Sequence, residues 1–432
     1  MKFLAFLLPA LLILKDASHL GDRFITRGLA EGLCGLAAVL WIITHLKRVD
    51  WRQHALLLAY LAVIFITGIF SDFRAAVMIQ FLSLLTVILF GMSLRYHPIG
   101  ADAHRVLMET TFWAYLAVTI ISILLLFIAP SIVYQVGNIA GWKRFAGLYD
   151  RPAMLGAASG ILFGIALFGT VRGGWLAKLA RIAAVIAALT CLYMSGARTF
   201  WVAFIVAAPM TAVVKYPRKI KMIMSFVTVA IILFSVYEAF DFHISKKSAE
   251  KELRVGSVST LTGRTTIWEA TFAAIQARPL TGFGLGMGGV ALVHRPGHAA
   301  SLIKERISVG ASLSRVPSLH SGYIQALGDT GVLGALVYLA VVVMTCLHYW
   351  RHRRAVQFGA ECFIVLYLTT ANIAESIIYK ASVWHSIMFW YLAAYVPVIM
   401  ISSIRKPNIN GDAYEASITS TDGNPRHIQR RY

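Results

Sequence analysis

One stretch decides how the chain is organised, and it contains Gly263-Arg264, Thr281-Gly-Phe-Gly-Leu-Gly-Met-Gly-Gly289 and His320-Ser-Gly-Tyr-Ile-Gln325. It runs from Asp241 to Gly334 and begins with the one long polar insertion in a string of apolar runs. The apolar periodicity resumes directly after His320. A histidine and several arginines therefore stand where a large loop meets an apolar helix, and we expect the chemistry of the protein there.

The composition is that of a protein that crosses a membrane many times. Of the 432 residues, 58% are apolar and 14% are charged, whereas soluble domains carry about 25% charged residues. The formal net charge is +20, and the basic residues stand in short clusters between the apolar runs. Such basic loops are typical of membrane topology, so we expect no nucleic-acid partner.

The apolar runs predict an all-α, polytopic integral membrane protein with about twelve transmembrane helices, at about 20 residues a span. The spans are predicted at Phe3–Leu14, Leu29–Leu46, Ala55–Phe70, Val77–Leu94, Val106–Ile128, Met154–Val171, Leu176–Met194, Phe200–Val214, Ile220–Phe240, Ser321–Tyr349, Phe358–Ile378 and Val383–Ile404. The first run lacks a small-residue cleavage site, which favours an uncleaved helix over a signal peptide.

These runs give the domain organisation. Transmembrane helices 1–9 are predicted in residues 1–240, a large periplasmic loop region with short helices in 241–318, helices 10–12 in 319–406, and a disordered cytoplasmic tail in 407–432. Cytoplasmic loops carry the excess of Lys and Arg. With a cytoplasmic N-terminus, Lys47-Arg48, Lys215 and Arg351 fall in short cytoplasmic connections. The large loop then faces the opposite side, the periplasm in a bacterium.

Several arginines lie on that outward face. Arg144, Arg151 and Arg198 stand in short connections beside helix ends, and Arg264 stands in the large loop. The planar, permanently charged guanidinium makes paired hydrogen bonds to phosphate. A set of these groups at the membrane surface therefore predicts a bound diphosphate. Contact with lipid headgroups and snorkelling at helix ends are the alternative reading.

The glycine run 282–289 and the glycines after His320 call for a backbone explanation. A dinucleotide-binding loop is excluded because no strand precedes the run and no acidic residue follows at the required distance. A tight turn that lets the backbone approach another segment is the expected structure, and a nest of N–H groups for phosphate is the alternative. Gly328, Gly331 and Gly334 are predicted to allow close helix packing.

Two carboxylates stand near this region. Asp329 follows His320 by nine residues, about 13 Å along a straight helix, so it should not orient the imidazole unless the helix is broken. Glu375 stands near the outer end of the eleventh predicted span. An intramembrane carboxylate is a candidate functional group, and pairing with Lys380 or with an arginine is the role we expect.

The four cysteines stand inside or at the edges of apolar runs: Cys34, Cys191, Cys346 and Cys362. Neither metal-ligand spacing nor a disulfide framework is present in the sequence, so core packing is their predicted role. The sequence also contains no Asp-x-Asp pair of the kind that holds a metal for a nucleotide-sugar donor. We therefore expect neither a metal nor a nucleotide cofactor.

Three features together resemble the superfamily of O-antigen ligases and Wzy-C polymerases. The first is Ser195-Gly-Ala-Arg198 at the start of a helix. The second is the late large loop with Gly263-Arg264 ahead of Trp268 and with Arg278-Pro-Leu-Thr-Gly-Phe-Gly-Leu-Gly286. The third is His320-Ser-Gly-Tyr-x-Gln, followed by Gly328-Asp-Thr-Gly-Val-Leu-Gly334. The segment Arg144-Phe-Ala-Gly-Leu-Tyr-Asp-Arg-Pro152 is also similar to a loop of that superfamily.

The resemblance implies a GT-C-like glycosyltransferase that uses an undecaprenyl-pyrophosphate-linked glycan. His320 is then the base that accepts the proton of the attacking sugar hydroxyl, since histidine exchanges protons near neutral pH. Arg198 and Arg264 neutralise the leaving diphosphate electrostatically. Further contacts to substrate are expected from Arg144, Arg151, Trp268, Tyr323 and Gln325. A single direct displacement inverts the anomeric centre.

The short polar tail favours an O-antigen ligase with lipid A–core as acceptor, acting among the lipids of the inner membrane to complete lipopolysaccharide. An O-antigen or exopolysaccharide polymerase and a protein O-oligosaccharyltransferase of the same superfamily are the alternatives. A transporter of lipid-linked glycan is the alternative of another class. Transporters usually carry inverted repeats and helices broken near the bilayer midplane, whereas the polar residues here gather at one predicted surface.

Overall fold

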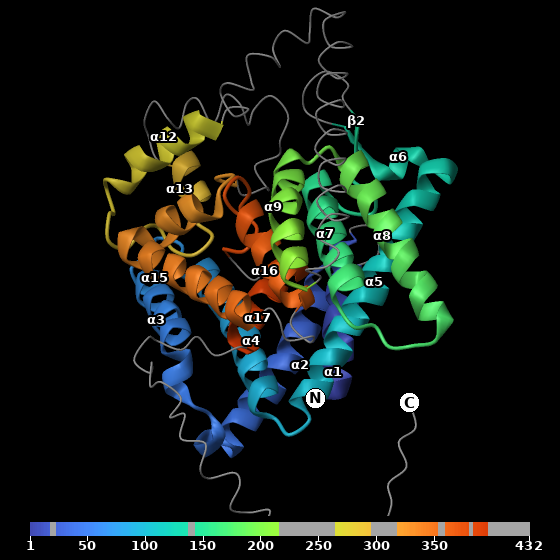
Figure 1. Cartoon of the computed structure of the whole chain (residues 1–432). Coiled ribbons are helices and arrows are strands. Elements are labelled where there is room, and N and C mark those ends of the chain that lie inside the picture. Colours follow the sequence, from blue (N-terminus) through green and yellow to red (C-terminus); the bar gives the residue numbers. More distant parts are fainter. Residues whose placement is uncertain are drawn as a thin grey trace, which may run out of the picture. The chain divides into compact units, whose positions relative to one another are not determined.

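The computed structural model describes residues 1–17, 23–136, 143–215, 264–294, 318–352, 359–379 and 383–395 (Figure 1). The chain divides into two units, Met1–Val398 and Ile399–Tyr432, and every described residue belongs to the first. The predicted span Ile220–Phe240, most of the loop 241–318 and the tail 407–432 lie outside the described residues.

Helices account for nearly all of the described structure. In the first half they are α1 (Lys2–Asp16), α2 (Arg23–Thr44), α3 (Ala55–Ile69), α4 (Arg74–Tyr96), α5 (Gly100–Ile128), α6 (Pro130–Val133), α7 (Pro152–Phe168), α8 (Trp175–Ser195) and α9 (Arg198–Lys215), with 3-10 turns at Leu46–Arg48 and Trp51–His54. In the second half they are α12 (Arg264–Ile275), α13 (Gly288–His294), α15 (Gly322–His352), α16 (Gly359–Ala371) and α17 (Trp384–Tyr395).

The helices confirm a polytopic membrane protein. Among the described residues, five segments are long and apolar enough to cross a membrane: Trp51–Ile69, Arg74–Tyr96, Gly100–Ile128, Trp175–Ser195 and Gly322–His352. Shorter apolar helices accompany them, among them α7 and α16. Large apolar side chains stay exposed on the helix surfaces, for example Phe127 at 79%, as contact with lipid requires. The count of twelve spans and the GT-C assignment stay predictions.

Two short strands depart from the all-α prediction. Residues Tyr134–Val136 (β1) pair antiparallel with Lys143–Phe145 (β2), and Gln135 faces Arg144 in the register. The strands connect α6 to the loop that precedes α7. The sequence signal was hidden because the pair is only three residues long on each side. The hairpin places Arg144 on a strand near the start of α7.

Helix α15 is broken, which corrects the continuous span predicted for Ser321–Tyr349. Gly331 has φ 66 and ψ −171, outside the helical region. The break folds the first part of α15 back toward the second. The rings of Tyr323 and Tyr338 lie 5.9 Å apart, whereas 15 residues of straight helix would separate them by about 22 Å. Glycine at this position accepts the left-handed φ that other residues resist.

Helix α16 packs against α7 and α9. The contacts between them show in which direction each helix runs. The rings of Phe200 and Tyr367 lie 5.9 Å apart, and those of Phe204 and Phe363 lie 6.3 Å apart. A step of four residues forward along α9 thus matches four residues backward along α16, so the two helices are antiparallel. Tyr367 also donates to the carbonyl of Gly156 in α7 at 2.7 Å.

The same contacts define two ends of this helix group. We call the end at which α7 and α9 begin and α16 stops the arginine end, because Arg151 precedes α7 and Arg198 begins α9. Glycines of α7 allow α7 and α16 to pack closely next to the arginine end. A Cβ at Gly160 would collide with the ring of Tyr367, and one at Gly164 with the ring of Phe363, as small residues between membrane helices lead one to expect.

Candidate active site

His320 and Glu375 face each other at the arginine end. The His320 Nδ1 atom lies 3.6 Å from the Glu375 Oε2 atom, and the two side chains are 40% and 20% exposed. The Nδ1 atom itself is buried, and within the described residues no hydrogen-bond partner satisfies it. The exposed part of the imidazole therefore lies away from Nδ1. The structure places Glu375 beside His320. Its predicted pairing with Lys380 or an arginine stays a prediction, and Lys380 lies outside the described residues.

The backbone explains why these distant residues meet. Helix α16 ends at Ala371, short of the predicted Ile378. The turn that follows is organised by Asn372, whose Oδ1 accepts from the N–H groups of Ile377 and Ile378 at 3.1 Å each. Its amide donates to the hydroxyl of Tyr338 at 2.9 Å. Asn372 is fully buried, so it fixes the turn that carries Glu375.

Gly322 joins that turn to the segment of His320. Its N–H donates to the carbonyl of Asn372 at 2.8 Å. A Cβ at Gly322 would overlap the Asn372 side chain, so glycine is required for this approach. Tyr323 adds a second link, since its hydroxyl donates to the carbonyl of Thr369 at 3.2 Å. Tyr323 was predicted to bind substrate; that role stays a prediction, and the contact seen is structural.

The backbone of His320 is strained. Its φ is 53, the one positive value among the described residues other than glycine. Such a conformation costs about 1–3 kcal/mol and persists only when the surroundings hold it. Two side chains hold the preceding residue: the N–H of Leu319 donates to Gln325 Oε1 at 3.1 Å, and its carbonyl accepts from Trp268 Nε1 at 2.9 Å. The predicted substrate-binding roles of Trp268 and Gln325 stay predictions beside these contacts.

Arg144 and Arg198 meet at one turn. Helix α8 ends in Gly196 with φ 57 and ψ 23, a left-handed C-cap, which is the usual way for a helix to stop at glycine. The Arg144 Nη2 group donates to the carbonyls of Ser195 at 3.2 Å and of Gly196 at 2.9 Å. The Ser195 hydroxyl accepts from the N–H of Ala197 at 3.2 Å. The Ser-x-x-Arg element is therefore a capped turn that presents Arg198, partly buried, at the start of α9.

The structure describes the side chain of Arg151 but only the backbone of Arg264. Arg151 is exposed directly before Pro152, the first residue of α7, and the fixed φ of proline suits that position. In the described part of the chain its guanidinium has no ion-pair partner. Arg264 begins α12, but its side chain lies outside the described residues. Three of the four predicted arginines are thus placed, and all three lie at the end of the helix group that also holds Glu375.

The glycine run wraps around the break in α15. The N–H of Phe283 donates to the carbonyl of Gly328 at 3.0 Å, and that of Gly284 donates to the carbonyl of Asp329 at 2.7 Å. The Asp329 carboxylate accepts from the N–H groups of Gly286 at 2.6 Å and Gly288 at 2.7 Å. The predicted close backbone approach is confirmed. The alternative of a phosphate nest is wrong for these four donors, because the protein itself occupies them.

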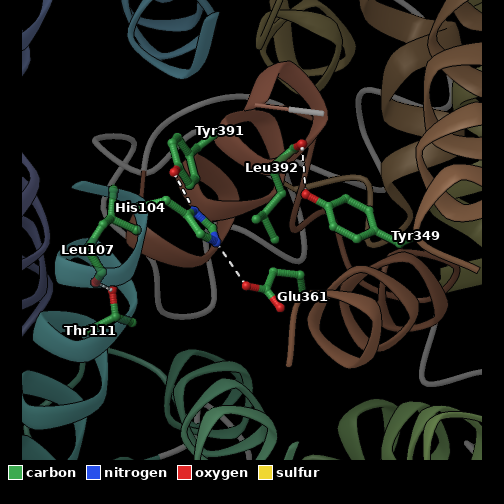
Figure 2. Close-up of polar contacts among 7 residues, drawn as sticks. All are labelled: His104, Leu107, Thr111, Tyr349, Glu361, Tyr391 and Leu392. Carbon is green, nitrogen blue, oxygen red and sulfur yellow. Dashed lines mark hydrogen bonds and ion pairs between the residues drawn. The ribbon is translucent and has the colours of Figure 1, made fainter. Parts of the chain in front are cut away.

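A second histidine–glutamate pair lies where α16 begins, at the opposite end from His320. His104 Nε2 lies 2.8 Å from Glu361 Oε1, and Nδ1 lies 2.6 Å from the hydroxyl of Tyr391 (Figure 2). His104 is 8% exposed and Glu361 is 4% exposed. The pair joins α5, α16 and α17 and offers no open face to a substrate. Sequence reasoning missed it because the three residues stand far apart without a motif.

The described residues of the site include neither a cluster of metal ligands nor an exposed thiol. Within the described ranges, no three His, Cys, Asp or Glu side chains are placed to hold a metal ion. Cys191 and Cys362 are buried, as core packing predicts, and Cys346 is partly buried beside Thr369, with Sγ 3.5 Å from the threonine hydroxyl. The absence of a metal from the reaction stays a prediction.

Comparison with known families agrees with the geometry. Residues 182–339 match the family model of the O-antigen ligases, Wzy_C. This match confirms the resemblance inferred from the sequence. It includes the turn with Arg198, the start of α12 at Arg264, the glycine run and His320. Members of the family are glycosyltransferase-like ligases and polymerases. No curated protein matches the chain.

The matched segment leaves three relevant residues outside it. Arg144 and Arg151 precede it, and Glu375 follows it. The structure therefore adds Glu375 to the site through its position beside His320, and it adds a capping role for Arg144. No pattern in the sequence could have found the Glu375 contact, because that contact depends on the turn at Asn372 and on the fold-back of α15.

Proposed function

We propose that the protein is an O-antigen ligase. It transfers a polysaccharide from undecaprenyl pyrophosphate to a sugar hydroxyl of lipid A–core at the periplasmic face of the bacterial inner membrane, without a metal and with inversion of the anomeric centre. The observation that carries this proposal is the imidazole–carboxylate pair of His320 and Glu375, placed at the same end of the helix group as three arginines. The family match of the surrounding segment supports it.

His320 acts as the general base. As the acceptor hydroxyl oxygen attacks the anomeric carbon, its proton passes to the imidazole. Glu375 lies 3.6 Å from Nδ1, so the nitrogen left for the acceptor is Nε2. A carboxylate there holds the ring in one orientation and stabilises the positive charge that it gains. The strained backbone of His320 is consistent with a residue held for function.

The arginines act on the leaving group. The bond between the anomeric carbon and the phosphate oxygen breaks, and its electron pair leaves with the lipid diphosphate. That group is already a stable anion and needs charge neutralisation more than protonation. Arg198 supplies a guanidinium from the start of α9, and Arg264 supplies one from the start of α12. Arg144 and Arg151 provide further contacts to the diphosphate or to the glycan.

The acceptor decides between ligase and polymerase. We expect purified protein in liposomes to join a lipid-linked glycan to lipid A–core, and to leave the donor unchanged when lipid A–core is omitted. Longer lipid-linked glycan in the absence of lipid A–core would instead assign a polymerase. Movement of intact donor between the leaflets without a new glycosidic bond would assign a transporter. An acceptor-independent product therefore overturns the ligase assignment.

A further inference from the structure

A fully buried carboxylate stands at the break in α15, and the proposed reaction does not use it. Asp329 lies two residues before Gly331 and is 0% exposed. Its Oδ2 atom accepts from Gly286 N–H at 2.6 Å. Its Oδ1 atom accepts from Gly288 N–H at 2.7 Å and from Gln325 Nε2 at 2.9 Å. Burying a carboxylate in a membrane protein is expensive unless its hydrogen bonds are made, so this arrangement is a specific one.

The hydrogen bonds of Asp329 continue to His320. Gln325 donates to Asp329 with its amide nitrogen and accepts the N–H of Leu319 with its oxygen, at 3.1 Å. Leu319 is the residue before His320, and its carbonyl is held by Trp268 of α12. Both polar atoms of the Gln325 side chain are therefore engaged, the oxygen by the backbone next to His320 and the nitrogen by the carboxylate of Asp329. The carboxylate determines which way the Gln325 amide faces.

The glycine run holds the carboxylate of Asp329 in position. Gly282, Gly284 and Gly286 have φ values of 62, 103 and 78, which favour glycine. A Cβ at Gly282 would lie 2.6 Å from the backbone carbon of Asp329. Because the glycines of the run bring no side chain between its backbone and α15, the N–H groups of Gly286 and Gly288 reach the carboxylate directly. Gly331, at the break in α15, also permits the close approach, because a Cβ there would collide with the backbone of Leu280.

We propose that Asp329 is a positioning residue for the glycan transfer, which fixes the place of His320 through Gln325 and Leu319 and ties it to the glycine run. This role rests on the proposed function, in which His320 is the general base. Asp329 itself touches no reacting atom. Asp329 thereby connects the glycine run, which has no role in the proposed reaction, to the residues that support the active site.

The test replaces the carboxylate by an amide of the same shape. Asp329→Asn puts an N–H₂ group against one of the three donors, because an amide offers a single acceptor oxygen. We expect kcat for transfer to lipid A–core to fall by about tenfold to a hundredfold, as small displacements of a catalytic group produce, with KM nearly unchanged. Gln325→Leu should lower kcat as well, and the double variant should be no worse than the worse single variant, because both act along one path.

A chemical readout separates this inference from the assigned reaction. Diethyl pyrocarbonate carbethoxylates accessible imidazoles, and peptide mass spectrometry measures the rate at His320 alone in the full-length purified protein. We expect this rate to change by about threefold or more in Asp329→Asn, because a less firmly held backbone at Leu319 alters the position and exposure of the imidazole. Glu361→Gln is the matched control, a buried carboxylate at the opposite end, and should leave the His320 rate unchanged. Both variants are first compared with wild type by gel filtration and thermal melting.

A milder variant keeps the test decisive should Asp329→Asn fail to fold. Gly288→Ala leaves the charge in place but sets a Cβ 2.8 Å from Asp329 Oδ1, so the carboxylate must move. It should change the His320 rate in the same direction. Wild-type rates at His320 in folded Asp329→Asn, or in Gly288→Ala, overturn the positioning role. A wild-type protein that transfers no glycan while these rates still shift overturns the proposed reaction and leaves the positioning of His320 supported.

Discussion

Replacing Glu375 by glutamine tests the pair at the centre of the site. Glu375→Gln keeps the size of the side chain and removes its negative charge. Two unit charges at about 4 Å attract by about 1 kcal/mol in water and about 4 kcal/mol at an effective dielectric constant of about 20. The His320 and Glu375 side chains are 40% and 20% exposed, and solvent screens such pairs. The lost stabilisation of a protonated His320 is therefore about 1–2 kcal/mol.

That energy converts into a rate. At about 1.4 kcal/mol for each factor of ten, kcat for transfer should fall by roughly 5- to 30-fold. The imidazole gains its positive charge as the reaction proceeds, so the effect belongs to the transition state and KM for either substrate should change little. The assay is transfer of a labelled glycan from undecaprenyl pyrophosphate to lipid A–core by purified protein in liposomes, with each substrate varied up to saturation so that kcat and KM are both measured.

A matched variant controls for the substitution. Glu269→Gln alters an exposed carboxylate on α12 and should leave kcat unchanged. Thermal melting of both variants shows whether the fold is kept. A kcat for Glu375→Gln within about twofold of wild type, well below the roughly fivefold loss that about 1 kcal/mol predicts, would refute the electrostatic role. A raised KM for the donor with unchanged kcat would assign Glu375 to binding instead.

Further predictions concern the arginines, the break in α15 and the metal. Arg198→Lys should lower kcat by about tenfold or more, because a point charge replaces a planar fork on the diphosphate; wild-type kinetics would remove Arg198 from the site. Gly331→Ala should lower the melting temperature by several degrees, since alanine resists the φ of 66 and its Cβ meets the backbone of Leu280. Gly174→Ala, with open space around its Cβ, is the control and should melt like wild type. Transfer should proceed at the same rate in excess chelator, and a sharp loss of activity there would contradict the metal-independent reaction.

The sequence located most of the described helices and several of the polar side chains near their ends. Apolar runs located α3 and α8 to within one residue at each end, because lipid and core both require apolar side chains over a known length. Arg198 and His320 were found because each stands beside the start of an apolar run, within a motif that resembles the superfamily. The family resemblance rested on the same residues, and the matching segment 182–339 contains them.

Other features depended on tertiary structure and left no local pattern. The break at Gly331 was invisible because glycine also serves close helix packing, which was the role expected from its spacing. The turn after Ala371 continues in apolar residues such as Ile377 and Ile378, both buried, so hydropathy extended the helix too far. The contact of Glu375 with His320 follows from that turn and could not be read from residues 55 positions apart.

The most direct test of the central claim is glycan transfer by the His320→Ala variant. Purified wild-type protein and the variant are placed in liposomes with the undecaprenyl-pyrophosphate-linked glycan and lipid A–core, and the new glycosidic bond is quantified by mass spectrometry. We predict product with inverted anomeric configuration from the wild type, and none above background from a variant that melts at the wild-type temperature. Product from His320→Ala at the wild-type rate would contradict the assignment of His320 as the base.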